Sequence, residues 1–164
     1  MKYHKFLLPT TYKVLAIHMG NINCAAFILS TILNSGGTFE SATKLQKIAF
    51  LSIYENNLET FTEFKWHHYG PFSKEIENTV NSLTQENMIV EETINRTSYS
   101  GNKYTIKRLS LTPKGHALAK ISIAKMNTHN KTALLDTINK YGNKPLNKIL
   151  EYVYNAYTPD DLSK

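Results

Sequence analysis

The order of patterns over residues 43–111 restricts the fold of this chain more than any other feature. Apolar residues repeat at three- and four-residue spacing over 43–54, which predicts a helix with one buried face. This helix starts either at Thr43, through a capping box, or at Ser41. An aromatic segment over 61–69 then predicts a strand, because bulky rings favour the extended backbone.

A second helix and a hairpin follow. Gly70-Pro71 predicts a sharp turn, since proline restricts both its own backbone and that of the residue before it. Ser73, as an N-cap followed by glutamates, predicts a helix over 73–86. Residues 88–94 and 103–111 then have the pattern of paired strands joined by a polar turn. A helix, a second helix and a two-stranded hairpin in this order form the outline of a winged helix.

Further helices are predicted on both sides of this core. Thr112-Pro113 supplies an N-cap and a first helical residue for a helix that reaches Met126. The other predicted elements are helices over 10–19, 22–33, 131–141 and 145–157 and an extended link over 38–40.

We therefore predict an α+β fold with a winged helix-turn-helix core and additional N-terminal and C-terminal helices. Residues 1–164 are expected to form a single domain, because this length is normal for one core. The winged-helix core is placed at about 22–111 and the C-terminal helical extension at about 112–158.

The charge of the chain is unevenly distributed. The formal net charge is +6, yet residues 101–150 contain ten basic residues and one Asp, a net of +9. Residues 61–100 contain three basic residues and six Glu, a net of −3. A polyanionic partner is therefore expected to contact the basic block.

The single cysteine, Cys24, excludes an internal disulfide and a cysteine-based zinc cluster. Its apolar neighbours indicate a small core residue rather than a reactive thiol. We find no segment with the length and apolarity of a membrane span or a secretory signal. We expect a cytoplasmic protein that does not contact membranes.

Double-stranded DNA is the first candidate partner. Proteins of this shape place one helix in the major groove and contact the backbone nearby. Lys44 and Lys47 are expected on the polar face of the first helix, and Lys103 and Lys107 share one face of the return strand. The predicted DNA-binding residues are Lys44, Lys47, Lys74, Asn78, Arg96, Lys103, Lys107 and Arg108.

The helix in the recognition position opposes this prediction. Residues 73–86 contain one Lys and three Glu, so the helix repels phosphates. Its outer face, which includes Asn78, either reads bases or is an ordinary solvated face. DNA is then contacted mainly by the hairpin with Lys44 and Lys47, or it is not bound at all.

A protein is the second candidate partner. The chain contains ten Tyr, seven Phe and one Trp. Tyr152, Tyr154 and Tyr157 cannot all face inward from one helix, and exposed tyrosines are typical of interfaces. These rings either bind a partner or hold the last helix against the body, with their hydroxyls in water. Either use is compatible with a homodimer.

No motif indicates an enzyme. His67 and His68 point to opposite faces of a strand, so they cannot bind one metal ion together. His116 and His129 have no spacing typical of metal ligands. We predict no catalytic residue, no metal site and no cofactor.

Two segments resemble a known family. Residues 44–51 (K-L-Q-K-I-A-F-L), residues 64–73 (F-K-W-H-H-Y-G-P-F-S) and the step from Leu83 to Met88-Ile89 are similar to the SocA-type antitoxin domain, also called Panacea, and to related phage-associated proteins. The resemblance covers about 43–92 and, loosely, 143–157. It implies a small cytoplasmic protein of toxin–antitoxin, phage or plasmid contexts that binds a partner protein such as a toxin. It supplies no catalytic residue.

Residues 111–115 (L-T-P-K-G) also resemble the segment that starts the helix after the wing in PadR- and MarR-like regulators. The sequence therefore predicts a winged-helix DNA-binding transcriptional regulator or antitoxin-like protein. The alternative is a protein-binding antitoxin or adaptor of the SocA type with no DNA-binding role. A homodimer is expected in either case.

Overall fold

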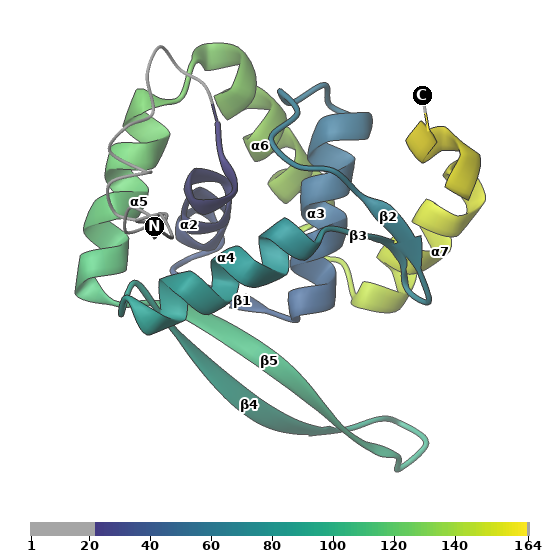
Figure 1. Cartoon of the computed structure of the whole chain (residues 1–164). Coiled ribbons are helices and arrows are strands. Elements are labelled where there is room, and N and C mark those ends of the chain that lie inside the picture. The colour runs from purple at the N-terminus through teal and green to yellow at the C-terminus, as the bar shows by residue number, and fades with distance from the viewer. Residues whose placement is uncertain (1–21, 164) are drawn as a thin grey trace, which may run out of the picture.

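A computed structural model describes residues 22–163 of the chain. Within them the chain forms six α-helices, a three-stranded antiparallel sheet and a separate two-stranded hairpin, which is an α+β fold (Figure 1). The helix predicted over 10–19 lies outside the described residues. The other predicted helices are all confirmed, with shifts at their ends.

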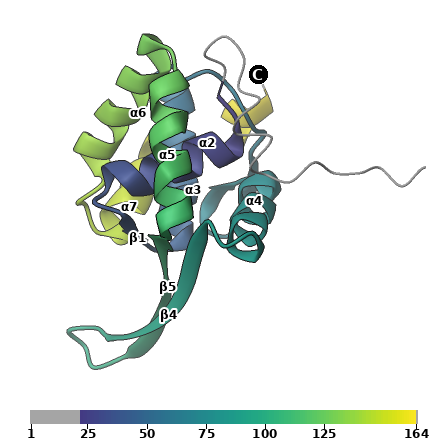
Figure 2. The ribbon, with the colours of Figure 1, turned by 90° about the vertical axis from the view of Figure 1, so that its left-hand side faces the viewer.

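The elements follow one another along the chain as α2 (Cys24–Asn34), β1 (Thr38–Glu40), α3 (Ala42–Tyr54), β2 (Lys65–His67), β3 (Gly70–Phe72), α4 (Lys74–Gln85), β4 (Ile89–Thr97), β5 (Lys103–Leu111), α5 (Pro113–Lys125), α6 (Thr128–Tyr141), α7 (Leu146–Ala156) and a short 3₁₀ helix, η1 (Pro159–Ser163). The larger sheet has the strand order β1-β5-β4, and β2 pairs with β3. Strands β4 and β5 extend beyond the helical body as a long ribbon (Figures 1 and 2).

Helix α2 forms the centre of the core. Most of its residues are apolar, and Phe27, Ile28, Leu29 and Ile32 are completely buried. It contacts α4, α5 and α6 as well as the sheet, and Figure 2 shows α5 crossing it. A helix that is apolar on most sides must be buried, which is why α4, α5 and α6 pack around α2.

Side-chain caps fix the starts of most helices. The hydroxyl of Ser73 accepts a hydrogen bond from the backbone of Ile76, and that of Thr112 accepts one from Gly115, so both predicted starts are confirmed. For α3 the cap is Ser41, whose hydroxyl accepts from Lys44 at 3.2 Å. The alternative start at Thr43 is therefore wrong.

The aromatic segment differs from the prediction of a strand over 61–69. Only Lys65–His67 is extended, and Gly70-Pro71 belongs to the return strand rather than to the turn. Phe61 stacks on Phe27 of the core at 4.9 Å between ring centroids. The rings therefore hold an irregular segment against the core, and only its end forms a hairpin.

Two further segments gain strand structure through distant pairing. The predicted link over 38–40 is a true strand, since Phe39 lies opposite Leu109 of β5. Strand β4 continues to Thr97, beyond the predicted 88–94, because each of its residues has a partner on β5.

Candidate functional site

A cleft of about 460 Å³ lies between α3, the β2–β3 turn, α4 and the base of the ribbon. We call it the α3–α4 cleft. Its apolar lining includes Leu45, Ile76 and Val80, and ionisable groups come from His67, His68, Glu77, Glu91 and Lys107. A mainly apolar hollow with a few polar groups is typical of a binding site.

A clamp of hydrogen bonds holds one wall of this cleft in place. The side-chain amide of Gln46 donates to the carbonyl of Ser73 at 3.0 Å and accepts from its backbone N–H at 2.8 Å. The hydroxyls of Thr62 and Ser73 lie 2.6 Å apart. These bonds fix the hairpin and the start of α4 to α3, so the segments that carry the family resemblance meet in space.

Lys47 belongs to the same clamp, and its predicted position on the polar face of α3 is wrong. The side chain is 1% exposed, and its ammonium donates to the carbonyl of Pro71 at 2.6 Å. Burial lowers the pKa of Lys47 to about 8. Its amino group is therefore not presented to a DNA phosphate.

Lys44 is also turned toward the protein rather than toward solvent. Its ammonium donates to the carbonyl of Gly142 at 2.5 Å and lies 5.7 Å from the centre of the Phe39 ring. Partial burial lowers the pKa of Lys44 despite the nearby Glu40. Lys44 is thus only partly exposed and ties α3 to the end of α6, and DNA binding by this residue stays a prediction.

Helix α4 exposes mainly uncharged polar groups. Lys74 forms an ion pair with Glu77 one turn later, so its charge is locally balanced. Asn78, Asn81 and Gln85 are exposed along the same side of the helix. This side has little positive charge with which to attract a polyanion.

The ribbon carries the remaining predicted cations, and most of them are paired. Arg96 and Arg108 each place a guanidinium nitrogen 2.7 Å from the same carboxylate oxygen of Glu40. Hydrogen bonding from Arg108 lowers the pKa of Glu40. Lys107 forms an ion pair with Glu91, whereas Lys103 is exposed and forms none of the ion pairs found within residues 22–163.

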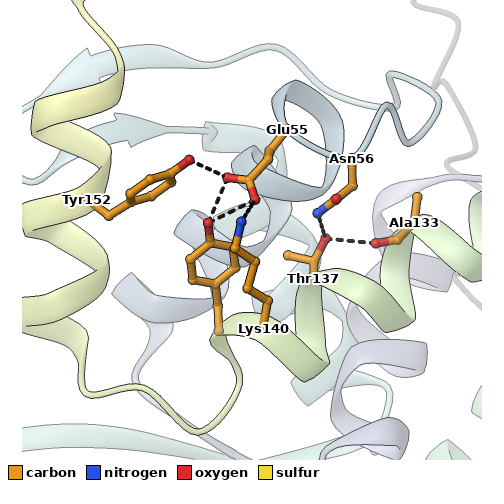
Figure 3. Close-up of polar contacts among 7 residues, drawn as sticks. Glu55, Asn56, Ala133, Thr137, Lys140 and Tyr152 are labelled. Carbon is orange, nitrogen blue, oxygen red and sulfur yellow. Dashed lines mark hydrogen bonds and ion pairs between the residues drawn. The ribbon is translucent and has the colours of Figure 1, made fainter.

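The three predicted partner-binding tyrosines all touch the body of the protein. The Tyr154 hydroxyl donates to the carbonyl of His68 at 2.7 Å, and the Tyr157 ring meets Phe50 edge-on at 4.9 Å. Tyr152 donates to Glu55 at 2.7 Å (Figure 3). Each ring therefore helps to hold α7 in place, and partner binding by these residues stays a prediction.

Glu55 is a central residue that the sequence did not reveal. Its carboxylate accepts from Tyr141 at 2.7 and 2.9 Å and forms an ion pair with Lys140 (Figure 3). Glu55, the first residue after α3, thus links the end of α3 to α6 and α7. The sequence around Glu55 does not predict this role, because all of its partners are distant in sequence.

The described histidines, cysteine and carboxylates do not form a metal site. Within residues 22–163 no group of three or more His, Cys, Asp or Glu side chains could hold a metal ion. A ring nitrogen of His129 lies 2.7 Å from the carbonyl oxygen of Asn57. Burial raises the pKa of the Cys24 thiol to about 12, which keeps it protonated.

Comparisons with family models, curated proteins and solved structures return no match to this chain. None of the helices within residues 22–163 has both the length and the apolarity to cross a membrane.

Proposed function

We propose that this protein is a winged-helix module that binds another protein through the α3–α4 cleft. The winged-helix part rests on the order of elements: α2, β1, α3, α4, β4 and β5, with β1 added to the edge of β5. In this reading α4 occupies the recognition position and the ribbon is the wing. The β2–β3 hairpin is an insertion where a helix-turn-helix has a short turn.

We favour a protein partner over DNA because most of the predicted DNA-binding lysines and arginines already have partners within the protein. Lys44 and Lys47 donate to backbone carbonyls. Lys74 and Lys107 each pair with a carboxylate, and Arg96 and Arg108 share that of Glu40. Of these wing and α4 cations, Lys103 alone forms none of the ion pairs found within residues 22–163. Affinity for DNA comes mainly from cations that neutralise phosphates. A surface whose cations are already paired lacks most of that contribution.

The cleft supplies what a protein partner requires. Hot spots of interfaces are apolar or aromatic anchors seated in preformed pockets and surrounded by polar groups. Tyr69, 65% exposed, stands at the rim of the α3–α4 cleft. It offers a large ring to a partner whose apolar side chain enters the cleft. A toxin, the partner implied by the family resemblance, is one protein that fits this description.

A matched pair of tyrosine variants tests this function. Tyr69 lines the cleft, whereas Tyr99 is fully exposed at the turn of the ribbon, away from it. Tagged wild type, Tyr69→Ser and Tyr99→Ser are expressed in the natural host, and co-purified proteins are quantified by mass spectrometry. We expect one stoichiometric partner that Tyr69→Ser reduces by about tenfold or more, as for a hot-spot residue, and that Tyr99→Ser retains.

The absence of any stoichiometric partner from wild type, or equal recovery by both variants, contradicts cleft-mediated binding. Circular dichroism of both variants checks that a lost partner does not reflect a lost fold.

DNA is the second candidate, favoured by the exposed amides of Asn78, Asn81 and Gln85 on α4. Amide side chains pair well with adenine in the major groove. Fluorescence anisotropy of a labelled random duplex between about 50 and 200 mM salt separates the two functions. Steep, salt-dependent binding, weakened in Lys103→Ala, supports DNA. No binding at low salt supports the protein partner.

A further inference from the structure

The outer edge of β4 carries a charge pattern that is complementary to itself. Strand β4 is at the edge of the sheet, and Figure 1 shows the ribbon projecting away from the helices. Glu92, Ile94 and Arg96 alternate along the strand, so they lie on one face. When this strand is set antiparallel to a copy of itself, Glu92 faces Arg96 and Ile94 faces Ile94 of the copy.

The hydrogen-bond pattern shows which backbone groups are directed to this edge. Ser98 donates to the carbonyl of Asn102 at 2.9 Å in the register that pairs β4 with β5. Hydrogen-bonded pairs alternate in an antiparallel ladder, so the even-numbered residues of β4 bond to β5. The N–H and C=O groups of Glu91, Thr93 and Asn95 are therefore directed outward.

We propose that a second copy of this chain pairs with the β4 edge about a two-fold axis at Ile94. In this antiparallel register Thr93 lies opposite Asn95 of the second copy. Both residues direct their backbone groups outward, so they exchange two hydrogen bonds on each side of the axis. Pairing the two ribbons forms one continuous four-stranded sheet in the distal region.

The side chains favour this register over its neighbours. Ile94 lies opposite Ile106 within the ribbon, and both are only half-buried. With Ile94 at the axis, the four isoleucines of two chains form one row across the sheet. Cross-strand β-branched pairs stabilise a sheet, and a shift by one residue would place these side chains on opposite faces.

The charges favour the same arrangement. Within one chain Arg96 and Arg108 share the single carboxylate of Glu40, so one carboxylate serves two guanidinium groups. Glu92 is exposed and forms none of the ion pairs found within residues 22–163. In the dimer Glu92 lies opposite Arg96 of the second copy, twice by symmetry. Opposite charges facing each other across strands are stabilising.

A strand from any protein can add to an open edge through its backbone. The pattern of Glu92, Ile94 and Arg96 selects a second copy, because it is complementary to its own reverse. This interface lies on the ribbon and does not depend on what the α3–α4 cleft binds.

The first test compares two proline variants. Thr93 directs its N–H to the β4 edge, whereas Thr105, exposed on the same face, directs its N–H to the other edge of the ribbon. Proline removes this donor and is tolerated on edge strands. Sedimentation velocity over about 1–100 µM protein should show a dimer for wild type and Thr105→Pro. Loss of one hydrogen bond on each side of the axis should weaken the Thr93→Pro dimer by about tenfold or more.

The second test exchanges charges and does not require proline. Glu92→Arg and Arg96→Glu each place like charges opposite one another in a homodimer, so each variant alone should be more monomeric than wild type. An equimolar mixture of the two restores both opposite pairs, and we expect a heterodimer by native mass spectrometry. The double variant E92R/R96E should form a homodimer again.

A wild-type chain that is monomeric throughout this range overturns the proposal. So does a dimer that Thr93→Pro leaves intact, or one that Thr105→Pro disrupts equally. If Thr93→Pro loses its far-UV circular dichroism signal, the charge mixture decides: failure of the heterodimer to form overturns the pairing at Ile94.

Discussion

The side-chain amide of Gln46 exchanges two hydrogen bonds with the backbone of Ser73, at 3.0 Å as donor and 2.8 Å as acceptor. Both groups are buried. Replacing Gln46 with Leu leaves the Ser73 N–H and C=O without these partners. Each buried polar group left unsatisfied costs about 1–3 kcal/mol, so we expect Gln46→Leu to lower the unfolding free energy by about 2–4 kcal/mol in urea titrations.

The matched control is Gln85→Leu, because Gln85 is exposed on α4. A surface change of this kind is expected to stay within about 0.5 kcal/mol of wild type. Equal effects of the two variants would mean that the Gln46–Ser73 clamp does not stabilise the fold.

The free energy of unfolding is expected to rise with pH because of Lys47. Burial lowers the pKa of its ammonium from 10.5 to about 8. Between these values the unfolded chain binds more protons than the folded one, so the unfolding free energy increases with pH, by about 3 kcal/mol in total. Below the pKa of the folded state, the buried ammonium destabilises the fold to its full extent. Above the pKa of the unfolded state, this destabilisation is absent.

The Lys47→Met variant lacks this rise. Urea unfolding of both proteins from about pH 7 to pH 10.5 covers the titration of the lysine. Cys24 and Tyr157, whose pKa values burial raises to about 12, lower the stability at high pH in both proteins alike. The difference between the two curves therefore isolates Lys47. A pH-independent difference would show that its ammonium is not desolvated in solution.

Local signals were enough to place most helices in advance. Ser73 and Thr112 bond to the backbone three residues later, and both the donor and the acceptor are visible in a short stretch of sequence. Helix caps of this kind depend little on the rest of the fold. The hairpin strand over 103–111 was also predictable, since its bounds follow from alternation and flanking turn residues.

Features that depend on distant partners were not predictable. Lys47 can be buried because the carbonyl of Pro71 accepts a hydrogen bond from its ammonium, and nothing in residues 42–54 indicates that acceptor. The turn of the small hairpin comes before Gly70-Pro71, because Gly70, with φ of 76°, is the first residue of the return strand. A local pattern cannot distinguish these positions.

The pairing of charges at the candidate site also depends on residues that are distant in sequence. Arg96 and Arg108 have the spacing of a cationic wing, yet both form an ion pair with Glu40, from a strand far earlier in the chain. Once the 38–40 segment pairs with β5, its carboxylate lies directly opposite Arg108. Counting charges along the sequence therefore overstated the positive field of the ribbon.

Gly115 is required by its close contact with Met88, the residue before β4, rather than by helix structure. A Cβ at this position would lie 1.8 Å from the carbonyl oxygen of Met88. In an open helix, changing Gly to Ala stabilises by about 0.5–1 kcal/mol. Here the clash reverses the sign, and we expect Gly115→Ala to destabilise by about 1–3 kcal/mol in thermal and urea unfolding.

The exposed Ala117 on the same helix calibrates this effect. Ala117→Gly measures helix propensity alone and is expected to cost about 1 kcal/mol. A Gly115→Ala protein as stable as wild type would contradict the seating of α5 against the start of β4.

Glu55 should control both the docking of α7 and the stability of the protein in acid. Partial burial alone would raise the pKa of Glu55. Hydrogen bonds from Lys140, Tyr141 and Tyr152 outweigh this effect and lower the pKa below its ordinary value of 4.5. The folded state therefore binds the proton more weakly than the unfolded chain. The stabilisation from ionised Glu55 is complete above the unfolded pKa and is lost as the pH falls through the folded pKa.

Glu55→Gln removes this dependence and weakens three contacts, at an expected cost of about 1–3 kcal/mol near neutral pH. Hydrogen exchange of the amides of α7 should accelerate, because Tyr152 loses its charged acceptor. The control is Glu151→Gln, which removes an exposed carboxylate of α7 that pairs only with Lys148 among the ion pairs of residues 22–163. Such a pair contributes little, so α7 should keep its protection. Faster exchange in Glu151→Gln than in Glu55→Gln would place the anchor of α7 elsewhere.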